Sequence, residues 1–144
     1  MTSSIIDCKI PGTIECVGKA VDQVLDGLYD IIDFSDETLL FDIKVILNEL
    51  LLNAVLHGNK GDRAKKVTVR ASVEDGGSYL YLSVEDEGEG FNYREILSNA
   101  GKECFCFDCL KETGRGLIIV KSLSDKLMFN DKGNQVVVMK KLSD

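Results

Sequence analysis

The chain is short of positive charge and contains no long hydrophobic run. Its 17 lysines and arginines are outnumbered by 24 aspartates and glutamates, which gives a formal net charge of −7 at pH 7. Nucleic-acid binding relies on clustered Lys and Arg side chains that contact phosphates, so this composition argues against a nucleic-acid-binding surface. No stretch reaches the roughly 20 consecutive apolar residues that span a bilayer. The N-terminal apolar run is short, contains Asp7 and has no basic residue before it. We therefore expect no signal peptide, no membrane span and a cytoplasmic location.

Histidine is scarce and cysteine is unevenly placed. The chain has one histidine, His57, and five cysteines, an odd number that cannot all pair internally. Three of the thiols, Cys104, Cys106 and Cys109, lie close together in the sequence and could bind a soft metal or act as a redox switch. A fourth nearby ligand is absent, because His57 belongs to another predicted element. The alternative is a half-buried loop that uses cysteine, and the sequence leaves both interpretations open.

The remaining composition is that of an ordinary globular protein. Hydrophobic residues make up 44% of the chain and charged residues 28%. A length of 144 residues is enough to bury one substantial core. We find no internal repeat, low-complexity tract or linker, so we expect a single domain over residues 1–144.

Two long segments have the three- and four-residue apolar spacing of amphipathic helices. The first covers residues 14–32. The second covers residues 37–57, with Ser35 or Asp36 as a suitable N-cap, and it is followed by the glycine- and asparagine-rich residues that commonly end a helix. Shorter helices are expected over residues 93–98 and 116–125.

Runs with two-residue alternation predict strands. Between the second and third runs, residues 74–78 contain adjacent glycines and favour an antiparallel hairpin. The order of strands and helices lacks the strict alternation of a doubly wound parallel sheet. We therefore predict an α+β fold, a two-layer sandwich of a mixed, mostly antiparallel β-sheet with helices on one face. The predicted strands cover residues 5–10, 66–73, 79–84, 126–130 and 135–141.

The second long helix carries a carboxylate and a carboxamide four residues apart. This spacing places Glu49 and Asn53 on one face, one turn apart, and His57 continues the same line. An acid beside a neutral oxygen ligand can orient a water or hydroxyl group and hold a hard cation such as Mg²⁺. Taken alone, the spacing is weak, because such pairs mostly lie on solvated helix faces.

A glycine-rich acidic turn follows the third predicted strand. Asp86 ends the strand, and Gly88 and Gly90 permit positive φ angles and close approach of the backbone to a ligand. A carboxylate beside such a turn can accept a hydrogen bond from an exocyclic amino group. The alternative is an ordinary acidic turn, since Asp and Gly are common turn residues.

A second glycine motif, Gly114-Arg115-Gly116-Leu117, opens the last predicted helix. Free N–H groups at a helix N-terminus form a phosphate site when glycine lets the chain wrap around the anion. Arg115 adds a forked donor for phosphate oxygens. The alternative is a flexible start to an ordinary helix.

These three segments, in this order, resemble the N, G1 and G2 boxes of the GHKL ATPase superfamily. Over residues 14–142 the chain looks most like the small anti-sigma factor serine/threonine kinases of the RsbW and SpoIIAB type. The resemblance implies the Bergerat, or histidine kinase-like ATPase, fold with ATP and Mg²⁺ as ligands. It makes Glu49 the general base, Asn53 the Mg²⁺ ligand and Asp86 the acceptor for the adenine amine.

The resemblance also implies roles for the remaining residues of the boxes. Gly88 and Gly90 would line the adenine pocket, and His57 would support the phosphates or the helix end. The β- and γ-phosphates would lie at residues 114–117, beneath a lid formed by residues 98–113. This lid departs from the family pattern, since it contains cysteine and phenylalanine and lacks proline.

The resemblance implies two protein partners, a sigma factor and a STAS-domain anti-anti-sigma protein that is phosphorylated on serine. It also allows a homodimer. A histidine kinase catalytic domain that acts on another phosphoacceptor protein remains an alternative. The second main interpretation is a nucleotide-binding module that sequesters its partner without significant kinase activity, and a third is a structural homologue that binds no nucleotide. Glu49 favours the kinase, because a pure binding module needs no base at this position.

Overall fold

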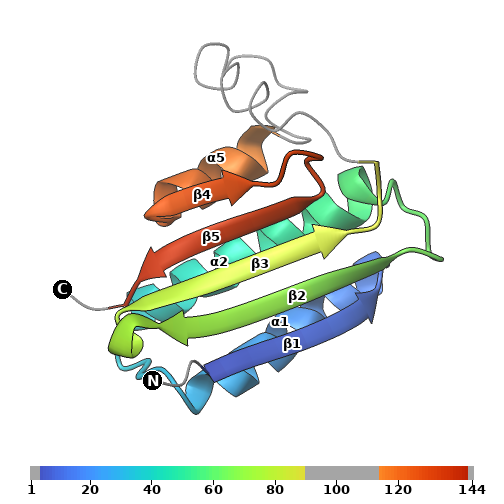
Figure 1. Cartoon of the computed structure of the whole chain (residues 1–144). Coiled ribbons are helices and arrows are strands. Elements are labelled where there is room, and N and C mark those ends of the chain that lie inside the picture. Colours follow the sequence, from blue (N-terminus) through green and yellow to red (C-terminus); the bar gives the residue numbers. More distant parts are fainter. Residues whose placement is uncertain (1–3, 90–113, 143–144) are drawn as a thin grey trace.

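The computed structural model describes residues 4–89 and 114–142. These residues form one sheet with helices packed against one face, as Figure 1 shows. The strand order is β1-β2-β3-β5-β4, and every described pair is antiparallel. The α+β prediction is therefore confirmed, although no parallel pair of a mixed sheet occurs among the described strands. The strands are β1 (Ser4–Pro11), β2 (Lys66–Glu74), β3 (Tyr79–Asp86), β4 (Lys126–Phe129) and β5 (Gln135–Lys141).

The sheet has one apolar and one largely polar face because side chains alternate along each strand. Val69 pairs with Val84, and Leu82 pairs with Val138, so buried side chains stand next to each other across β2, β3 and β5. The intervening side chains point away from the helices. The hairpin between β2 and β3 forms as predicted, and Gly76 there has a φ of 69°.

Three helices are described: α1 (Ile14–Tyr29), α2 (Glu37–Asn53) and α5 (Gly114–Leu123). Asp36 caps α2, since its side chain accepts a hydrogen bond of 2.9 Å from the Thr38 N–H. The prediction that α1 extends to residue 32 was wrong. The N–H groups of Ile31 and Ile32 both bond to the Leu28 carbonyl, at 2.9 and 2.8 Å, which closes the helix. Ile32 is still buried, so the apolar spacing continues beyond the helix end.

The core lies between the sheet and the helices. Full burial of a large aliphatic side chain contributes roughly 1.5–3 kcal/mol, so these side chains dominate the stability of the two layers. No helix in the described residues is long and apolar enough to cross a membrane. The largest fully buried side chains include Leu28, Ile43, Ile46, Leu47, Leu51, Leu80, Leu82 and Leu117.

A lysine near the end of β5 fixes the last turn of α5. The Lys140 ammonium donates to the Leu123 carbonyl at 2.6 Å and lies 3.3 Å from the Asp42 carboxylate of α2. Both charged side chains are mostly buried, at 15% and 17% exposure. A cation at a helix C-terminus interacts favourably with the free carbonyls there. Lys140 therefore joins α5, α2 and the sheet at one point.

Candidate functional site

The first turn of α5 lies against the polar face of α2. A Cβ atom added at Gly116 would lie 2.6 Å from the Glu49 Oε2 atom and 3.7 Å from the Asn53 Nδ2 atom. Any side chain at position 116 would therefore displace the Glu49 carboxylate. The structure thus brings together three residues that the sequence predicted as one site, although they are far apart along the chain.

The Asn53 carboxamide is buried, with 5% of its surface exposed. Its Nδ2 atom has no hydrogen-bond partner in the described part of the chain. An unpaired buried donor costs about 1–3 kcal/mol, and such a group commonly marks a functional site. The amide therefore suits a ligand that supplies the missing contact.

The donor set fits a magnesium ion that a ligand brings with it. A carboxamide oxygen at Asn53 and a nearby Glu49 carboxylate are the hard oxygen donors that Mg²⁺ prefers. Among the described residues, no group of three or more His, Cys, Asp or Glu side chains could hold a metal ion. Magnesium commonly binds through one or two protein oxygens and completes its shell with waters and phosphates.

Beyond Asn53 the helix widens into a π-helical turn, Ala54–Gly58. The Asn59 N–H donates to the carbonyl of Ala54, five residues earlier, at 2.7 Å, and this separation is the hydrogen-bond pattern of a π-helix. The prediction of α-helix through His57 was therefore wrong for the last turn. His57 lies half-buried in this turn, and no hydrogen bond joins its ring to the described residues.

Asp86 lies at the end of β3 with only 3% of its surface exposed. The Gly88 N–H donates to its Oδ1 atom at 2.8 Å. A Cβ atom at Gly58 would collide with the Asp86 carboxylate, and one at Gly88 would collide with the Gly58 carbonyl oxygen. Asp86 and its turn are thus packed directly on the end of the helix that carries Glu49.

Sequence reasoning missed Gly58 as a site residue and treated it only as a helix terminator. Its φ is not positive, so backbone freedom does not explain the glycine. The reason is space, because the Asp86 carboxylate occupies the position of a side chain. No local sequence pattern could have shown this contact between the π-helical turn and β3.

Burial raises the pKa of the Asp86 carboxyl group above its usual value, and the hydrogen bond from the Gly88 N–H partly opposes this rise. A pKa higher in the folded than in the unfolded chain means that the folded protein binds more protons between the two values. The contribution of Asp86 to the free energy of unfolding therefore falls as pH rises through this window, from the ordinary aspartate pKa upward.

We expect Asp86→Asn to stabilise the protein at pH 7 by about 1 kcal/mol, because it removes a buried charge. The same change should reduce the loss of stability between about pH 4 and pH 7. Denaturant unfolding at several pH values measures both effects. Asp22→Asn, on the exposed side of α1 and away from Asp86, is the matched control and should leave the pH dependence nearly unchanged. A fall in stability at pH 7 for Asp86→Asn would contradict this account.

The predicted phosphate segment is only partly described. α5 begins at Gly114, and Leu117 is fully buried with 0% exposure, so its side chain belongs to the core. The Arg115 side chain and Gly90 lie outside what the structure describes, as do the predicted lid and the helix at residues 93–98. Cys104, Cys106 and Cys109 also lie in the segment that is not described.

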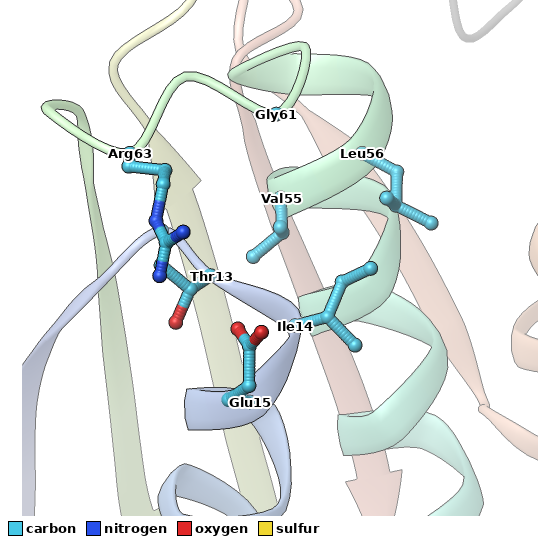
Figure 2. A pocket seen from close by; sticks show the side chains of 8 residues that line it. Thr13, Ile14, Glu15, Val55, Leu56, Gly61 and Arg63 are labelled. Atoms are coloured by element: carbon cyan, nitrogen blue, oxygen red, sulfur yellow. The ribbon is translucent and has the colours of Figure 1, made fainter.

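A cavity of about 160 Å³ lies on another side of the π-helical turn. Figure 2 shows Arg63 and Glu15 bringing opposite charges to it, next to Val55 and Leu56. None of the site residues predicted from the sequence lines it. The other lining residues are Gly12, Thr13, Ile14 and Gly61.

Comparison with known proteins adds a family match and three similar proteins. A family model described as a histidine kinase-like ATPase domain matches residues 19–141. The chain is 26% identical over 140 residues to the serine-protein kinase RsbW of Oceanobacillus iheyensis, covering 94% of this chain and 85% of that protein. It is 28% identical to the serine-protein kinase RsbW of Bacillus subtilis over 138 residues, with 94% and 84% covered. It is 32% identical to the anti-sigma F factor of Clostridium perfringens over 112 residues, with 72% and 74% covered.

Proposed function

Since the chain belongs to the histidine kinase-like ATPase domain family, we propose that it is an ATP-dependent anti-sigma factor serine kinase. In this proposal it binds ATP with Mg²⁺ and transfers the terminal phosphoryl group to a serine of a STAS-domain anti-anti-sigma protein. It also binds a sigma factor, so that phosphorylation controls which partner is held. An ATPase domain implies ATP binding, and relatives are named serine-protein kinase and anti-sigma F factor.

The observation that carries the proposal is the contact of Gly116 with Glu49 and Asn53. It places a carboxylate and a carboxamide beside the first turn of α5, whose free N–H groups suit phosphate oxygens. Phosphoryl transfer needs mainly positioning and neutralisation of charge, and this arrangement supports both. Magnesium, when bound, supplies further neutralisation of the phosphate charge.

In this proposal each residue near the α2–α5 contact has one role. The Glu49 carboxylate accepts the proton of the attacking serine hydroxyl as a general base. The Asn53 oxygen is the protein ligand for the metal. The backbone of residues 114–117 binds the phosphates, together with the Arg115 guanidinium. His57 supports the phosphates or the end of the helix.

The adenine end of the nucleotide is assigned to the Asp86 turn. The Asp86 Oδ1 atom accepts from the Gly88 N–H, and the second carboxylate oxygen is left to accept from the exocyclic amine of adenine. Gly88 and Gly90 border the base in this proposal, as the resemblance to the family implies. The packing of Gly58 against this carboxylate supports the assignment, because it joins the adenine end and the catalytic end through one helix.

Thermal unfolding with and without nucleotide tests the proposal first. ATP with Mg²⁺ at about one hundred times its Kd should stabilise the protein by about 2.7 kcal/mol and raise its Tm. Incubation with labelled ATP and a STAS-domain partner should then yield phosphoserine on that partner. No change in Tm would rule out the nucleotide site. A raised Tm with no phosphoserine would instead favour the sequestration module.

A further inference from the structure

Two buried asparagine side chains hold the peptide group that follows Asp86. The carbonyl oxygen of this group, from Asp86, accepts a hydrogen bond of 3.0 Å from the Asn134 Nδ2 atom. Its N–H, from Glu87, donates at 2.8 Å to the Asn59 Oδ1 atom. Both asparagines are buried, at 1% exposure for Asn59 and 9% for Asn134. One peptide group is thus bonded at both ends by side chains from opposite sides.

Asn59 links this peptide group to the helix and to β2. Its Nδ2 atom donates to the Lys66 carbonyl at 3.1 Å, and its backbone N–H closes the π-helical turn on the Ala54 carbonyl. The Glu87 carboxylate also binds the backbone of Lys66, because it accepts from the Lys66 N–H at 2.6 Å. Asn59 therefore fixes the Asp86 turn relative to the helix that carries Glu49 and Asn53.

Asn134 holds the turn from the β4–β5 hairpin. Its backbone carbonyl accepts from the Asp86 N–H at 2.9 Å, and its Oδ1 atom accepts from the Asn130 Nδ2 atom at 2.7 Å. The Asn130 Oδ1 atom also accepts from three consecutive backbone N–H groups of the hairpin, those of residues 133–135. The Asn134 amide is thus held in place before any ligand binds, which is the requirement for a positioning group.

We infer that Asn59 and Asn134 are positioning residues that set the preference of this site for adenine over guanine nucleotides. The inference rests on the proposed function, in which the Asp86 carboxylate accepts from the amine of adenine. Guanine has a carbonyl oxygen at the corresponding position, and a fixed carboxylate repels it. Discrimination of this kind requires the Asp86 carboxylate to keep its orientation. A buried polar group that the wrong ligand leaves unpaired then lowers the affinity for that ligand strongly. The two asparagines fix the backbone from which the carboxylate projects. The Gly88 N–H and the close packing of Gly58 then hold the carboxylate itself in that orientation.

The alternative is that the two asparagines only stabilise the fold. Loss of a hydrogen bond to a buried partner costs about 1–3 kcal/mol whatever the ligand. A purely structural role would therefore lower Tm, and would reduce the affinities for ATP and GTP by the same factor. A positioning role changes the ratio of the two affinities, so that ratio is the diagnostic quantity.

Isothermal titration of the full chain with ATP and with GTP, each with Mg²⁺, measures this ratio. Asn59→Ala removes the acceptor for the Glu87 N–H, and Asn134→Asp keeps the shape but removes the donor to the Asp86 carbonyl. Each should reduce the preference for ATP about tenfold. Asn59→Asp keeps the acceptor and should retain the preference within about threefold, even though both affinities fall. Asn48→Ala, on the exposed side of α2, is the control and should change nothing.

The results separate this inference from the proposed function. Absence of ATP binding by the unchanged protein would overturn both. ATP binding with an unaltered ratio in Asn134→Asp, or an equal loss of preference in Asn59→Asp and Asn59→Ala, would overturn this inference alone. If Asn59→Ala does not fold, as its Tm will show, the isosteric Asn134→Asp decides the question.

Discussion

Replacement of Glu49 by glutamine is expected to lower the rate of phosphoryl transfer by about 10²–10⁴-fold. Glutamine has nearly the same shape, so it fits beside Gly116, but its carboxamide cannot take the proton of the attacking hydroxyl. The affinity for ATP should stay within about threefold of the original, because in our assignment the nucleotide is held by other groups. Single-turnover phosphorylation measures the rate, and titration with ATP measures the affinity.

Glu37→Gln is the matched control for this experiment. Glu37 lies in the first turn of the same helix and is exposed, so the change should leave both rate and affinity nearly unaltered. If Glu49→Gln loses ATP binding as well as turnover, Glu49 is part of the nucleotide site rather than the base. If it retains the full rate, another group accepts the proton.

A second large effect is expected for Gly58→Ala. The added methyl group would collide with the Asp86 carboxylate, while the Gly58 carbonyl oxygen is already closely approached by Gly88. Both neighbours are buried, so relief requires the Asp86 turn to move away from the helix. We expect the free energy of unfolding to fall by about 1–3 kcal/mol and the affinity for ATP to fall at least about tenfold.

Gly18→Ala is the matched control, since a Cβ atom at Gly18 in α1 would meet nothing within 4 Å. Alanine is favoured over glycine inside a helix, so this variant should gain about 0.4–1 kcal/mol of stability without any change in affinity. Calorimetry and ATP titration of the two variants test the comparison. Normal ATP affinity in a folded Gly58→Ala variant would show that the position of the Asp86 turn is not critical.

The strands and the starts of α1 and α2 could be predicted because they depend on local patterns. The prediction for α5 was wrong by two residues at each end, since the helix covers Gly114–Leu123 rather than residues 116–125. β5 has the predicted bounds, and β2 and β3 extend the predicted strands by one and two residues. Two-residue alternation and the glycines of the hairpin are sufficient for this part of the fold. The start of α2 could be predicted equally well, since aspartate, present here as Asp36, is a common N-cap residue.

The winding of the chain after Asn53 could not be predicted, because the π-helical turn depends on tertiary contacts. Asn59 reaches Lys66 and Glu87, which are 7 and 28 residues away in the sequence. The wide turn presents Gly58 to the Asp86 carboxylate and Asn59 to the peptide group that follows. Neither contact leaves a periodic signal in the sequence.

The candidate site, like the fold, could be predicted from local patterns only in part. Spacing alone placed Glu49 and Asn53 on one helix face, but it could not show which other segment faces them. Their contact with Gly116 was implied only by the resemblance to a known family. The burial of Asp86 and the two asparagines that hold its peptide group require the packed structure, because they come from three separate elements.

The contacts at the two ends of α5 together determine how long this helix can be. Lys140 binds the Leu123 carbonyl at one end, and Gly116 abuts Glu49 at the other. Inserting or deleting one residue between them would rotate one end by about 100° relative to the other. The exposed side chains of α5 can therefore differ among natural relatives that have this site. We expect these relatives to show no length variation between positions 116 and 123. The hairpin at Asp75–Gly77 carries no such restriction, and length changes should accumulate there instead.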